Sequence, residues 1–239
     1  EQLRNSRELT AEFEYQRSLQ RSIAEQTGPT MPEKISVLFL AANPLDTQPL
    51  RLDAEVRSIT EKLRMSEHRD AVELISRWAV RTTDVLQHLN EHRPEVIHFS
   101  GHGGSDGSLC FEGSDGQAKD VAVEAIAATL ASAGDDVVVV LFNACFSAAQ
   151  AQAAVRHIPV AIGMSDELDD EAASVFASHF YSAIGFGHSI KKAFEQAQAA
   201  LRLDGQDDAD IVCLFLRDGS DEERILVGRP CRAQPLGDP

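Results

Sequence analysis

A histidine and a cysteine in this sequence each follow an apolar run that is expected to be a buried strand. His102 is separated by one residue from the run VIHFS and is enclosed by glycines in the stretch GHGG, residues 101–104. Cys145 comes directly after VVVVLFNA, the most apolar run of the chain. These are the residue types of a cysteine nucleophile and its base, because a neighbouring imidazole lowers the pKa of a thiol and accepts its proton.

The backbone next to this pair could stabilise a developing negative charge. The glycines around His102 leave backbone N–H groups uncovered, and the N–H groups of Gly103 and Cys145 are natural donors to an oxyanion. A helix that is expected to start near Ser147 would favour the thiolate of Cys145 through its N-terminal dipole. The sequence therefore predicts a site in which a peptide carbonyl lies between the thiol and the imidazole.

The elements that must position the pair alternate between strand and helix. Continuous apolar runs indicate buried parallel strands, and apolar residues on one face of a longer stretch indicate helices. Strands are expected at 35–43, 71–77, 94–100, 108–113, 136–144, 158–164 and 211–217. Helices are expected at 49–65, 82–92, 121–134, from about 147, at 170–184 and at 188–201. This alternation predicts an α/β domain with a mainly parallel sheet.

A crossover connection between the two strands would bring His102 and Cys145 to the same edge of the sheet, where the sites of open α/β folds form. Each residue alone has an ordinary explanation. The glycines around His102 could make a tight turn, and a single cysteine is more often a small core residue than a nucleophile. The loop lacks the spacing of phosphate-binding glycine motifs. The pairing of the two residues is what favours an enzyme.

The composition of the chain limits the classes of molecule that are expected to bind it. The 239 residues carry 22 basic and 38 acidic side chains, a formal net charge of −16. Such a surface repels phosphate backbones and anionic lipids, so neither nucleic acid nor a membrane is an expected partner. No apolar run reaches the roughly 18 residues of a membrane span, and no signal peptide is apparent, so we expect a cytoplasmic protein. The four cysteines show no zinc-ligand spacing, and no metal or other cofactor is expected.

Three segments are expected along the chain. Residues 1–30 are polar with a sparse helical stripe and end in a proline-containing linker, so we expect a helical arm that connects to an upstream sensor or regulatory module. Residues 31–217 hold the alternating strands and helices and form the predicted peptidase domain. Residues 218–239 are polar, acidic and then proline-rich, and are expected to form a tail.

The motifs HFSGHGG and LFNACFS, followed by IPVAIGMSDELDDEAASVFASHFYSAIGFGHSIKKAFEQA, resemble a prokaryotic CHAT domain, a branch of the caspase-like cysteine peptidases. The opening KISVLFLAANPLDTQPLRLDAEVRSI resembles the same group, and the resemblance covers residues 34–217. It implies a caspase-like three-layer α/β sandwich. It also implies that His102 is the general base and acid, that Cys145 is the nucleophile, and that the backbone N–H groups of Gly103 and Cys145 bind the oxyanion.

The resemblance also implies where the side chain before the cleaved bond, the P1 residue, would bind. That pocket would be formed by Asn43, Asp46, Asn143, Met164, Ser165 and Asp166. An acid such as Asp166 would pair with a basic P1 residue. The alternatives are that Met164 makes the pocket apolar, and that the acids at 169–171 only cap a helix.

We therefore expect a cysteine endopeptidase that cleaves a partner protein at a specific site, regulated and acting in bacterial immunity, such as antiviral defence, or in signalling. The immunity role is implied by the resemblance alone. The main alternative is a catalytically silent module of the same family that recruits partners. A nucleotide-responsive switch is disfavoured by the missing phosphate loop and the acidic charge.

Overall fold

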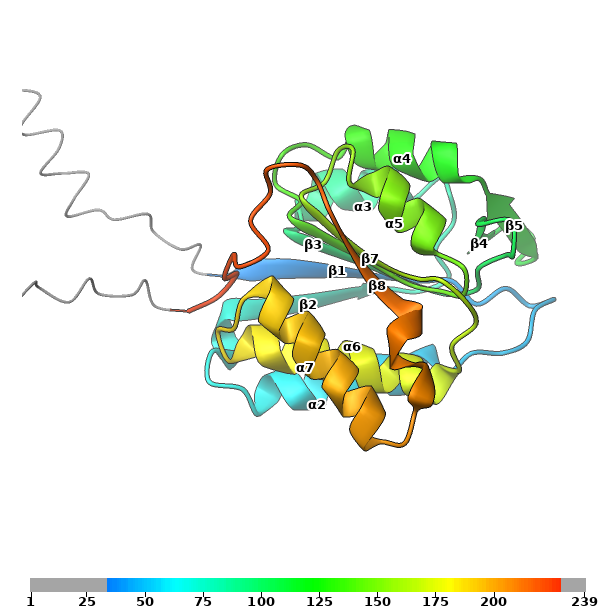
Figure 1. Cartoon of the computed structure of the whole chain (residues 1–239). Coiled ribbons are helices and arrows are strands. Elements are labelled where there is room, and N and C mark those ends of the chain that lie inside the picture. The colour runs from blue at the N-terminus through cyan, green and yellow to red at the C-terminus, as the bar shows by residue number, and fades with distance from the viewer. Residues whose placement is uncertain (1–33, 229–239) are drawn as a thin grey trace, which may run out of the picture. The chain divides into compact units, whose positions relative to one another are not determined.

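The structure, a computed structural model, describes residues 34–228 (Figure 1). These residues belong to one compact unit that begins at Lys34. The predicted arm over residues 1–30 lies outside the described residues, as does the predicted tail from residue 229 onward. The predicted peptidase domain and the first part of the tail can therefore be compared with the structure.

A six-stranded sheet forms the centre of the domain. Its strands are arranged in the order β2 (Val72–Arg77), β1 (Ile35–Ala41), β3 (Val96–Ser100), β6 (Val139–Asn143), β7 (Val160–Met164) and β8 (Val212–Leu216). All neighbouring pairs are parallel except β7 and β8, which are antiparallel. The predicted mainly parallel sheet is confirmed.

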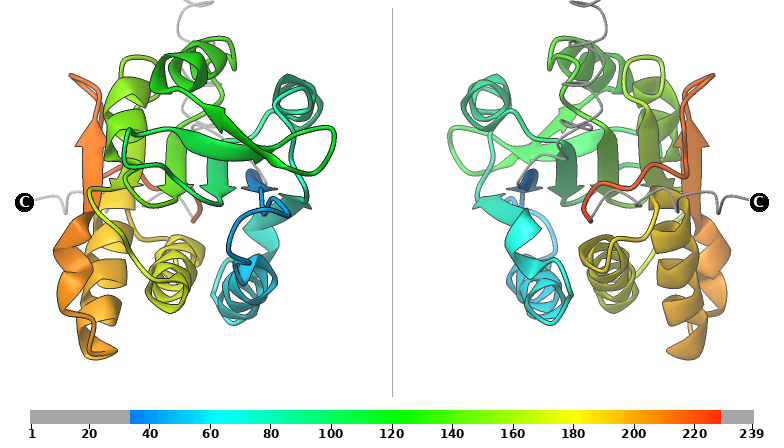
Figure 2. Two further views of the ribbon diagram at one scale, coloured as in Figure 1. Left: turned by 90° about the vertical axis from the view of Figure 1, so that its right-hand side faces the viewer. Right: turned by 90° about the vertical axis from the view of Figure 1, so that its left-hand side faces the viewer.

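Helices cover both faces of this sheet and make the fold three-layered (Figures 1 and 2). One face packs against α2 (Leu52–Arg64), α6 (Asp170–Gly185) and α7 (Ile190–Leu203), and the other against α3 (Val85–His92), α4 (Val123–Ala131) and α5 (Ala148–Ala154). Two short 3-10 turns, η1 (Arg69–Ala71) and η2 (Asp207–Ile211), precede β2 and β8. No helix among residues 34–228 is long and apolar enough to cross a membrane.

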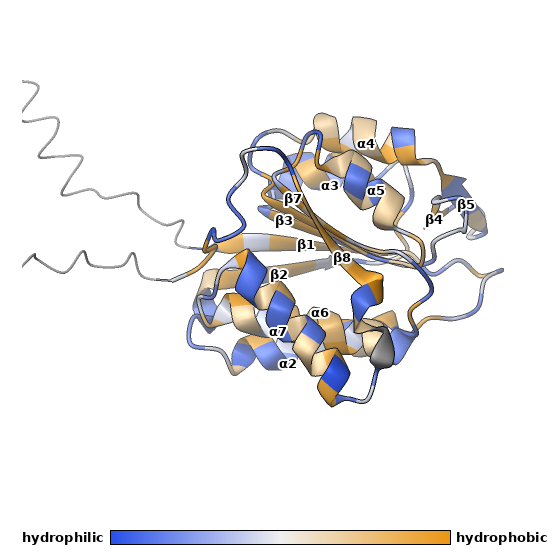
Figure 3. Ribbon diagram, viewed as in Figure 1, coloured by the Kyte–Doolittle hydropathy of each residue, from blue (hydrophilic) through white to orange (hydrophobic). Residues whose placement is uncertain are grey.

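The strands are apolar because both of their faces are buried. Along β1, Val37 and Phe39 belong to the core cluster under α2, α6 and α7, whereas Leu38 and Leu40 belong to the cluster under the other three helices. Figure 3 shows the corresponding pattern, with apolar strands inside and polar stretches on the outer helix faces. Continuous apolar runs are what this two-sided burial requires.

The short strand expected at 108–113 does not join the central sheet. It forms β4 (Leu109–Glu112), which pairs antiparallel with β5 (Ala118–Val121) at the carboxyl end of the parallel strands (Figure 2). β5 was not expected, because its residues AKDV are mostly exposed and show no apolar alternation.

The chain does not leave the domain at residue 217, where the tail was expected to begin. Leu226 and Val227 are buried in the core cluster under α2, α6 and α7. The backbone N–H of Ile190 donates to the carbonyl of Arg224, and Lys191 Nζ lies 2.6 Å from Glu222 Oε1. The polar composition of 218–225 concealed this segment, whose contacts are mainly hydrogen bonds and ion pairs.

Candidate active site

The two motif residues lie beyond the ends of adjacent strands. In the parallel pair β3–β6, Ser100 is the register partner of Asn143. His102 and Cys145 each follow two residues later, so both emerge at the carboxyl edge of the sheet. They line the same pocket. The rest of its wall is largely apolar and includes Leu50, Leu52, Met164 and Leu168.

Two glycines bring the histidine loop against its neighbours. A Cβ atom on Gly101 would lie 2.8 Å from the carbonyl oxygen of Ala42, and one on Gly103 would overlap the carbonyl oxygen of Cys145. Neither position could carry a larger side chain without a shift of backbone. Gly101 therefore permits the close approach of the histidine loop to Ala42 after β1, and Gly103 permits its close approach to the loop that carries Cys145.

The histidine is oriented by a backbone carbonyl. His102 Nε2 lies 2.7 Å from the carbonyl oxygen of Gln48, in the loop after β1. A carbonyl oxygen only accepts hydrogen bonds, so Nε2 carries the proton in the neutral ring. Nδ1 is then left as the basic atom of His102, with its lone pair free to accept a proton from a thiol.

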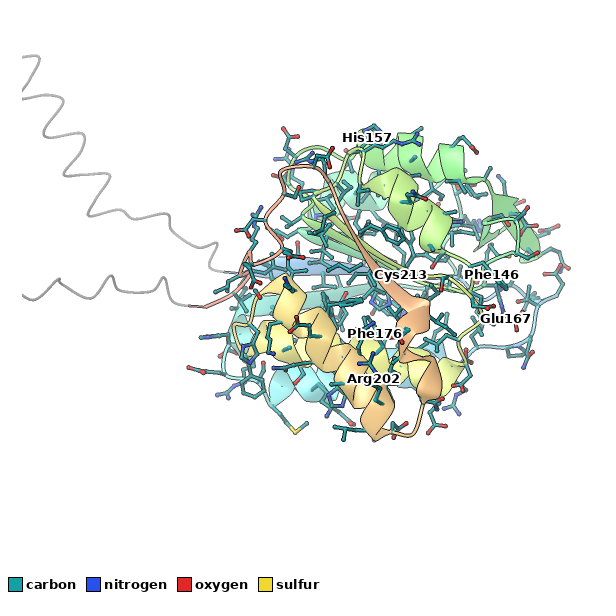
Figure 4. The ribbon with its side chains drawn as sticks, in the orientation of Figure 1. Phe146, His157, Glu167, Phe176, Arg202 and Cys213 are labelled. Carbon is teal, nitrogen blue, oxygen red and sulfur yellow. The ribbon has the colours of Figure 1, made fainter. Side chains whose placement is uncertain are left out.

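A strained turn carries the cysteine out of its strand. Phe146, directly after Cys145, has a φ of 56°, a left-handed conformation that is rare for an aromatic residue. Its N–H donates to the carbonyl of Asp166 at 3.4 Å. Figure 4 shows Phe146 near Glu167 at the end of the molecule where the parallel strands finish. The turn therefore rests against the loop after β7.

A buried hydroxyl holds this turn in place. Ser147 Oγ donates to the carbonyl of Phe142 and accepts the N–H of Met164, both at 3.0 Å. Ser147 is fully buried and lies immediately before α5. It thus links β6, β7 and the start of the helix, while Cys145 remains partly exposed with its Sγ 3.8 Å from the carbonyl of Leu168.

The two expected oxyanion donors are available. Gly103 lies opposite Leu109 in an isolated antiparallel bridge, whose hydrogen bonds run from Cys110 N to His102 O and from Gly104 N to Ser108 O. Within residues 34–228, neither the N–H of Gly103 nor that of Cys145 donates to a protein acceptor. Both groups are free to bind a substrate oxygen.

A buried carboxylate that the sequence analysis did not single out joins the two strand ends. Glu55 of α2 is 4% exposed. Its Oε2 accepts from Ser100 Oγ and its Oε1 from Asn143 Nδ2, each at 2.6 Å. His98 Nε2 lies 3.1 Å from Oε1, outside hydrogen-bond geometry, and His98 Nδ1 lies 3.2 Å from Tyr181 Oη. Burial, with the nearby charge of Glu55, raises the pKa of Tyr181 well above its usual value, so its hydroxyl stays protonated.

The structure separates the six residues expected at the P1 pocket. Asn143 and Met164 line the pocket. The other four are not part of its lining, namely Asn43, Asp46, Ser165 and Asp166.

Three of those four hold loops in place through backbone groups. Asn43 bonds both the N–H and the carbonyl of Leu50 at 3.2 Å, and Asp46 Oδ1 accepts the N–H of Ala118 at 2.7 Å. Ser165 Oγ donates to the carbonyl of Ile211. The carboxylate of Asp166 accepts from its neighbour Glu167.

The acidic run after Asp166 divides between capping and the pocket. Asp169 is the N-cap of α6, and its carboxylate accepts the N–H of Ala172 at 2.8 Å. Asp170, one residue later, lines the pocket.

The sequence signal for Glu55 was its position on the buried face of α2, between Leu52 and Ile59, where an acidic residue is unusual.

Outside the pocket, one group of side chains has the composition of a metal site. Ligand atoms of His88, Glu91 and His92 on α3 lie within 4.8 Å of one another. The guanidinium of Arg77 is 2.6 Å from His92 Nε2 and 4.0 Å from Glu91. That fixed positive charge opposes a cation at this position, and the cluster fits an Arg–His–Glu contact better.

Comparisons with known proteins identify a family and a fold. The sequence model of the CHAT domain family matches residues 3–227. A curated relative from Gillisia limnaea, described as a probable protease, is 23% identical over 154 residues, which are 64% of this chain and 27% of the relative. The chain thus spans about a quarter of the length of that relative.

Among solved structures, caspase-1 from Spodoptera frugiperda aligns with a TM-score of 0.51 at 8% identity, over 78% of this chain and 87% of the caspase. The Drosophila initiator caspase Dronc aligns with a TM-score of 0.46 at 11% identity, over 72% of this chain and 74% of that one. The first of these likenesses shows a caspase-like fold, as the resemblance in the sequence had implied.

Proposed function

This chain belongs to the CHAT domain family, and on that premise we propose that it is a cysteine endopeptidase with His102 and Cys145 as its catalytic pair. The observation that carries the proposal is the convergence of both side chains on one pocket beside two free backbone N–H groups. A nucleophile, an oriented base and an oxyanion site are the parts that acyl transfer needs. The description of the Gillisia limnaea relative as a probable protease also supports it.

The proposed reaction starts with transfer of the Cys145 proton to His102 Nδ1. The thiolate attacks the peptide carbonyl carbon, and the electron pair of the C=O bond moves to oxygen, where the N–H groups of Gly103 and Cys145 bind it. The C–N bond then breaks, and His102 gives its proton to the leaving amine. His102 then takes a proton from water, whose oxygen attacks the thioester carbonyl. The C–S bond breaks, the carboxylic acid leaves, and His102 returns the proton to the Cys145 thiolate.

Gln48 has a positioning part in this scheme. Its carbonyl accepts the Nε2–H of His102 and keeps the ring in the tautomer whose Nδ1 is basic. The same bond stabilises the imidazolium that forms when Cys145 loses its proton, because a carbonyl dipole favours a positively charged donor. The pocket beside the pair, with Asn143 and Met164 in its wall, would receive the P1 side chain.

We further propose that the substrate is a partner protein and that cleavage is regulated, in the cytoplasm of a bacterium and as part of immunity or signalling. Residues 1–30 would link the domain to the module that senses the signal. The acidic charge of −16 suits a partner with a basic surface around the cleavage site.

A reactive-site probe tests the function against the alternative of a silent interaction module. The protein is treated with a peptidyl acyloxymethyl ketone, and the modified residue is located by mass spectrometry. The proposal predicts rapid labelling of Cys145 that falls at least about 100-fold in His102→Ala, since an imidazole base typically contributes that much. Labelling of Cys145 at the same slow rate in both proteins would favour the silent module.

A further inference from the structure

Part of the lining of the pocket beside Cys145, here called the floor, consists of two hydrogen-bond acceptors, the carboxylate of Glu55 and Oδ1 of Asn143. Glu55, which lines the pocket, carries a carboxylate with about four acceptor positions, and Ser100 and Asn143 fill two of them. The side-chain oxygen of Asn143, Oδ1, is buried and has no hydrogen-bond partner in residues 34–228. A buried acceptor without a donor costs free energy, so this floor is incomplete without a donor from elsewhere.

The carboxylate also lacks a permanently charged partner. Among the residues that the structure describes, no lysine or arginine pairs with Glu55, and His98 is the one ionisable base within ion-pair distance. Arg51, at the edge of the pocket, instead pairs with Asp53 at 3.2 Å. A buried carboxylate of this kind gains most from a cation that enters the pocket with its own donors.

The walls suit the stem of a long basic side chain. Leu50, Leu52, Met164 and Leu168 line the pocket above the floor. Lysine and arginine bury their methylene groups against apolar surface and carry only donors at the end. Asp170, whose Oδ2 accepts the N–H of Arg51 at 3.3 Å, adds a second carboxylate to the lining.

We propose that Glu55 is the residue that selects the substrate, by binding a guanidinium or ammonium group of an arginine or lysine immediately before the cleaved bond. The inference rests on the proposed peptidase function and specifies its substrate class. Two free acceptor positions on the carboxylate match the two parallel N–H groups that a guanidinium offers, and Asn143 Oδ1 accepts a third. The proposal keeps the basic P1 preference that was considered from the sequence. The residue that binds the basic side chain is now Glu55 instead of Asp166.

The test uses pairs of probes of similar shape, of which one member is charged and the other is neutral. Two pairs of peptidyl acyloxymethyl ketones carry arginine or citrulline, and lysine or norleucine, at the P1 position, and the rate of Cys145 modification is measured for each. We expect the charged member of each pair to react roughly 10- to 100-fold faster, the value of hydrogen bonds to a charged group. Equal rates, or faster reaction of the citrulline and norleucine probes, would overturn the assignment of Glu55 and leave the peptidase intact.

The variant Glu55→Gln tests whether Glu55 is the residue that binds the charged P1 group. The substitution keeps one acceptor oxygen for the strand ends but removes the charge, so the arginine-to-citrulline ratio is expected to fall to about 1. An equal fall with both probes would show that Glu55 only positions Ser100 and Asn143, and would overturn the proposal. The matched control is Glu171→Gln, which removes an exposed acid one residue from Asp170 and outside the pocket lining, and should keep the ratio.

Two further outcomes are separable. If Glu55→Gln unfolds at a much lower temperature than the wild type, the comparison of probes on the wild type still decides the charge preference, because it needs no variant. If no probe of either charge modifies Cys145 in the wild type, the failure lies with the proposed peptidase function.

Discussion

Gly103 lies so close to the backbone of Cys145 that a Cβ atom added to it would overlap the Cys145 carbonyl oxygen. The loop that carries the proposed base is therefore in direct backbone contact with the loop that carries the proposed nucleophile. This contact explains why glycine follows His102, and it links the geometry of the two proposed catalytic residues.

Replacing Gly103 with alanine should separate the two loops. We expect Gly103→Ala to lower kcat/KM about 100-fold, because a displacement of about 1 Å can have that effect, and to destabilise the fold by roughly 1–3 kcal/mol through overpacking. Peptide cleavage and urea unfolding measure the two effects. Gly113→Ala is the control, since its new Cβ would meet the end of the Asp115 side chain, which can move. Full activity in Gly103→Ala would refute the contact.

Ser147 should contribute more to the free energy of unfolding than an exposed serine does, because it holds the turn after Cys145. Ser147→Ala leaves the buried N–H of Met164 without an acceptor, so the free energy of unfolding should fall by about 1–3 kcal/mol. Ser132→Ala removes an exposed hydroxyl that donates to the carbonyl of Thr129, and should change the free energy of unfolding by less than about 0.5 kcal/mol. Equal effects in urea denaturation would mean that the Ser147 bonds do not hold the turn.

Asn43 should act on catalysis through the loop that holds His102. The side chain of Asn43 forms hydrogen bonds with both backbone groups of Leu50. Leu50 lies two residues after Gln48, whose carbonyl accepts the hydrogen bond from His102 Nε2. Asn43→Ala should lower kcat roughly 10-fold with little change in KM, and should move the acidic limb of the pH–rate profile, because the imidazolium loses its oriented acceptor. A rise in KM with kcat and the pH profile unchanged would instead indicate that Asn43 contacts the substrate.

The cysteines should differ in their reaction with iodoacetamide as the pH rises. Burial, together with the charge of Asp120, raises the pKa of Cys110 to about 11. A raised thiol pKa keeps the protonated, unreactive form below that value, so Cys110 should stay unmodified at pH 7–9 while the partly exposed Cys145 reacts. Peptide mapping after labelling at each pH checks this order. Modification of Cys110 as early as Cys145 would contradict the burial of β4.

Much of the site could be predicted because its residues follow long apolar runs. Two-sided burial makes β3 and β6 almost continuously apolar, and their ends mark His102 and Cys145 without knowledge of the loops. The same reasoning did not reach Glu55. The helical periodicity of α2 was defined by its apolar positions, and an acid between Leu52 and Ile59 is informative only when the strand ends that it contacts are known.

Loop residues were harder to assign for a physical reason. Which wall a loop side chain faces depends on local backbone turns that have no period. Asp46 and Asp166 were therefore expected to form the pocket, but neither is part of its lining. Asp46 proved to accept an N–H of β5, a strand with no apolar alternation. The segment 218–225 was misread as tail for the same reason, since polar contacts hold it to α7.

The most direct test of the central claim is cleavage of a peptide library with varied P1 residues by the wild type, Cys145→Ala and His102→Ala, followed by mass spectrometry. The account predicts cleavage by the wild type, loss of cleavage in both variants while each retains the melting temperature of the wild type, and arginine or lysine before the cut. Cleavage that persists in Cys145→Ala, or a folded wild type that cleaves no peptide and is not modified at Cys145 by reactive probes, would contradict it.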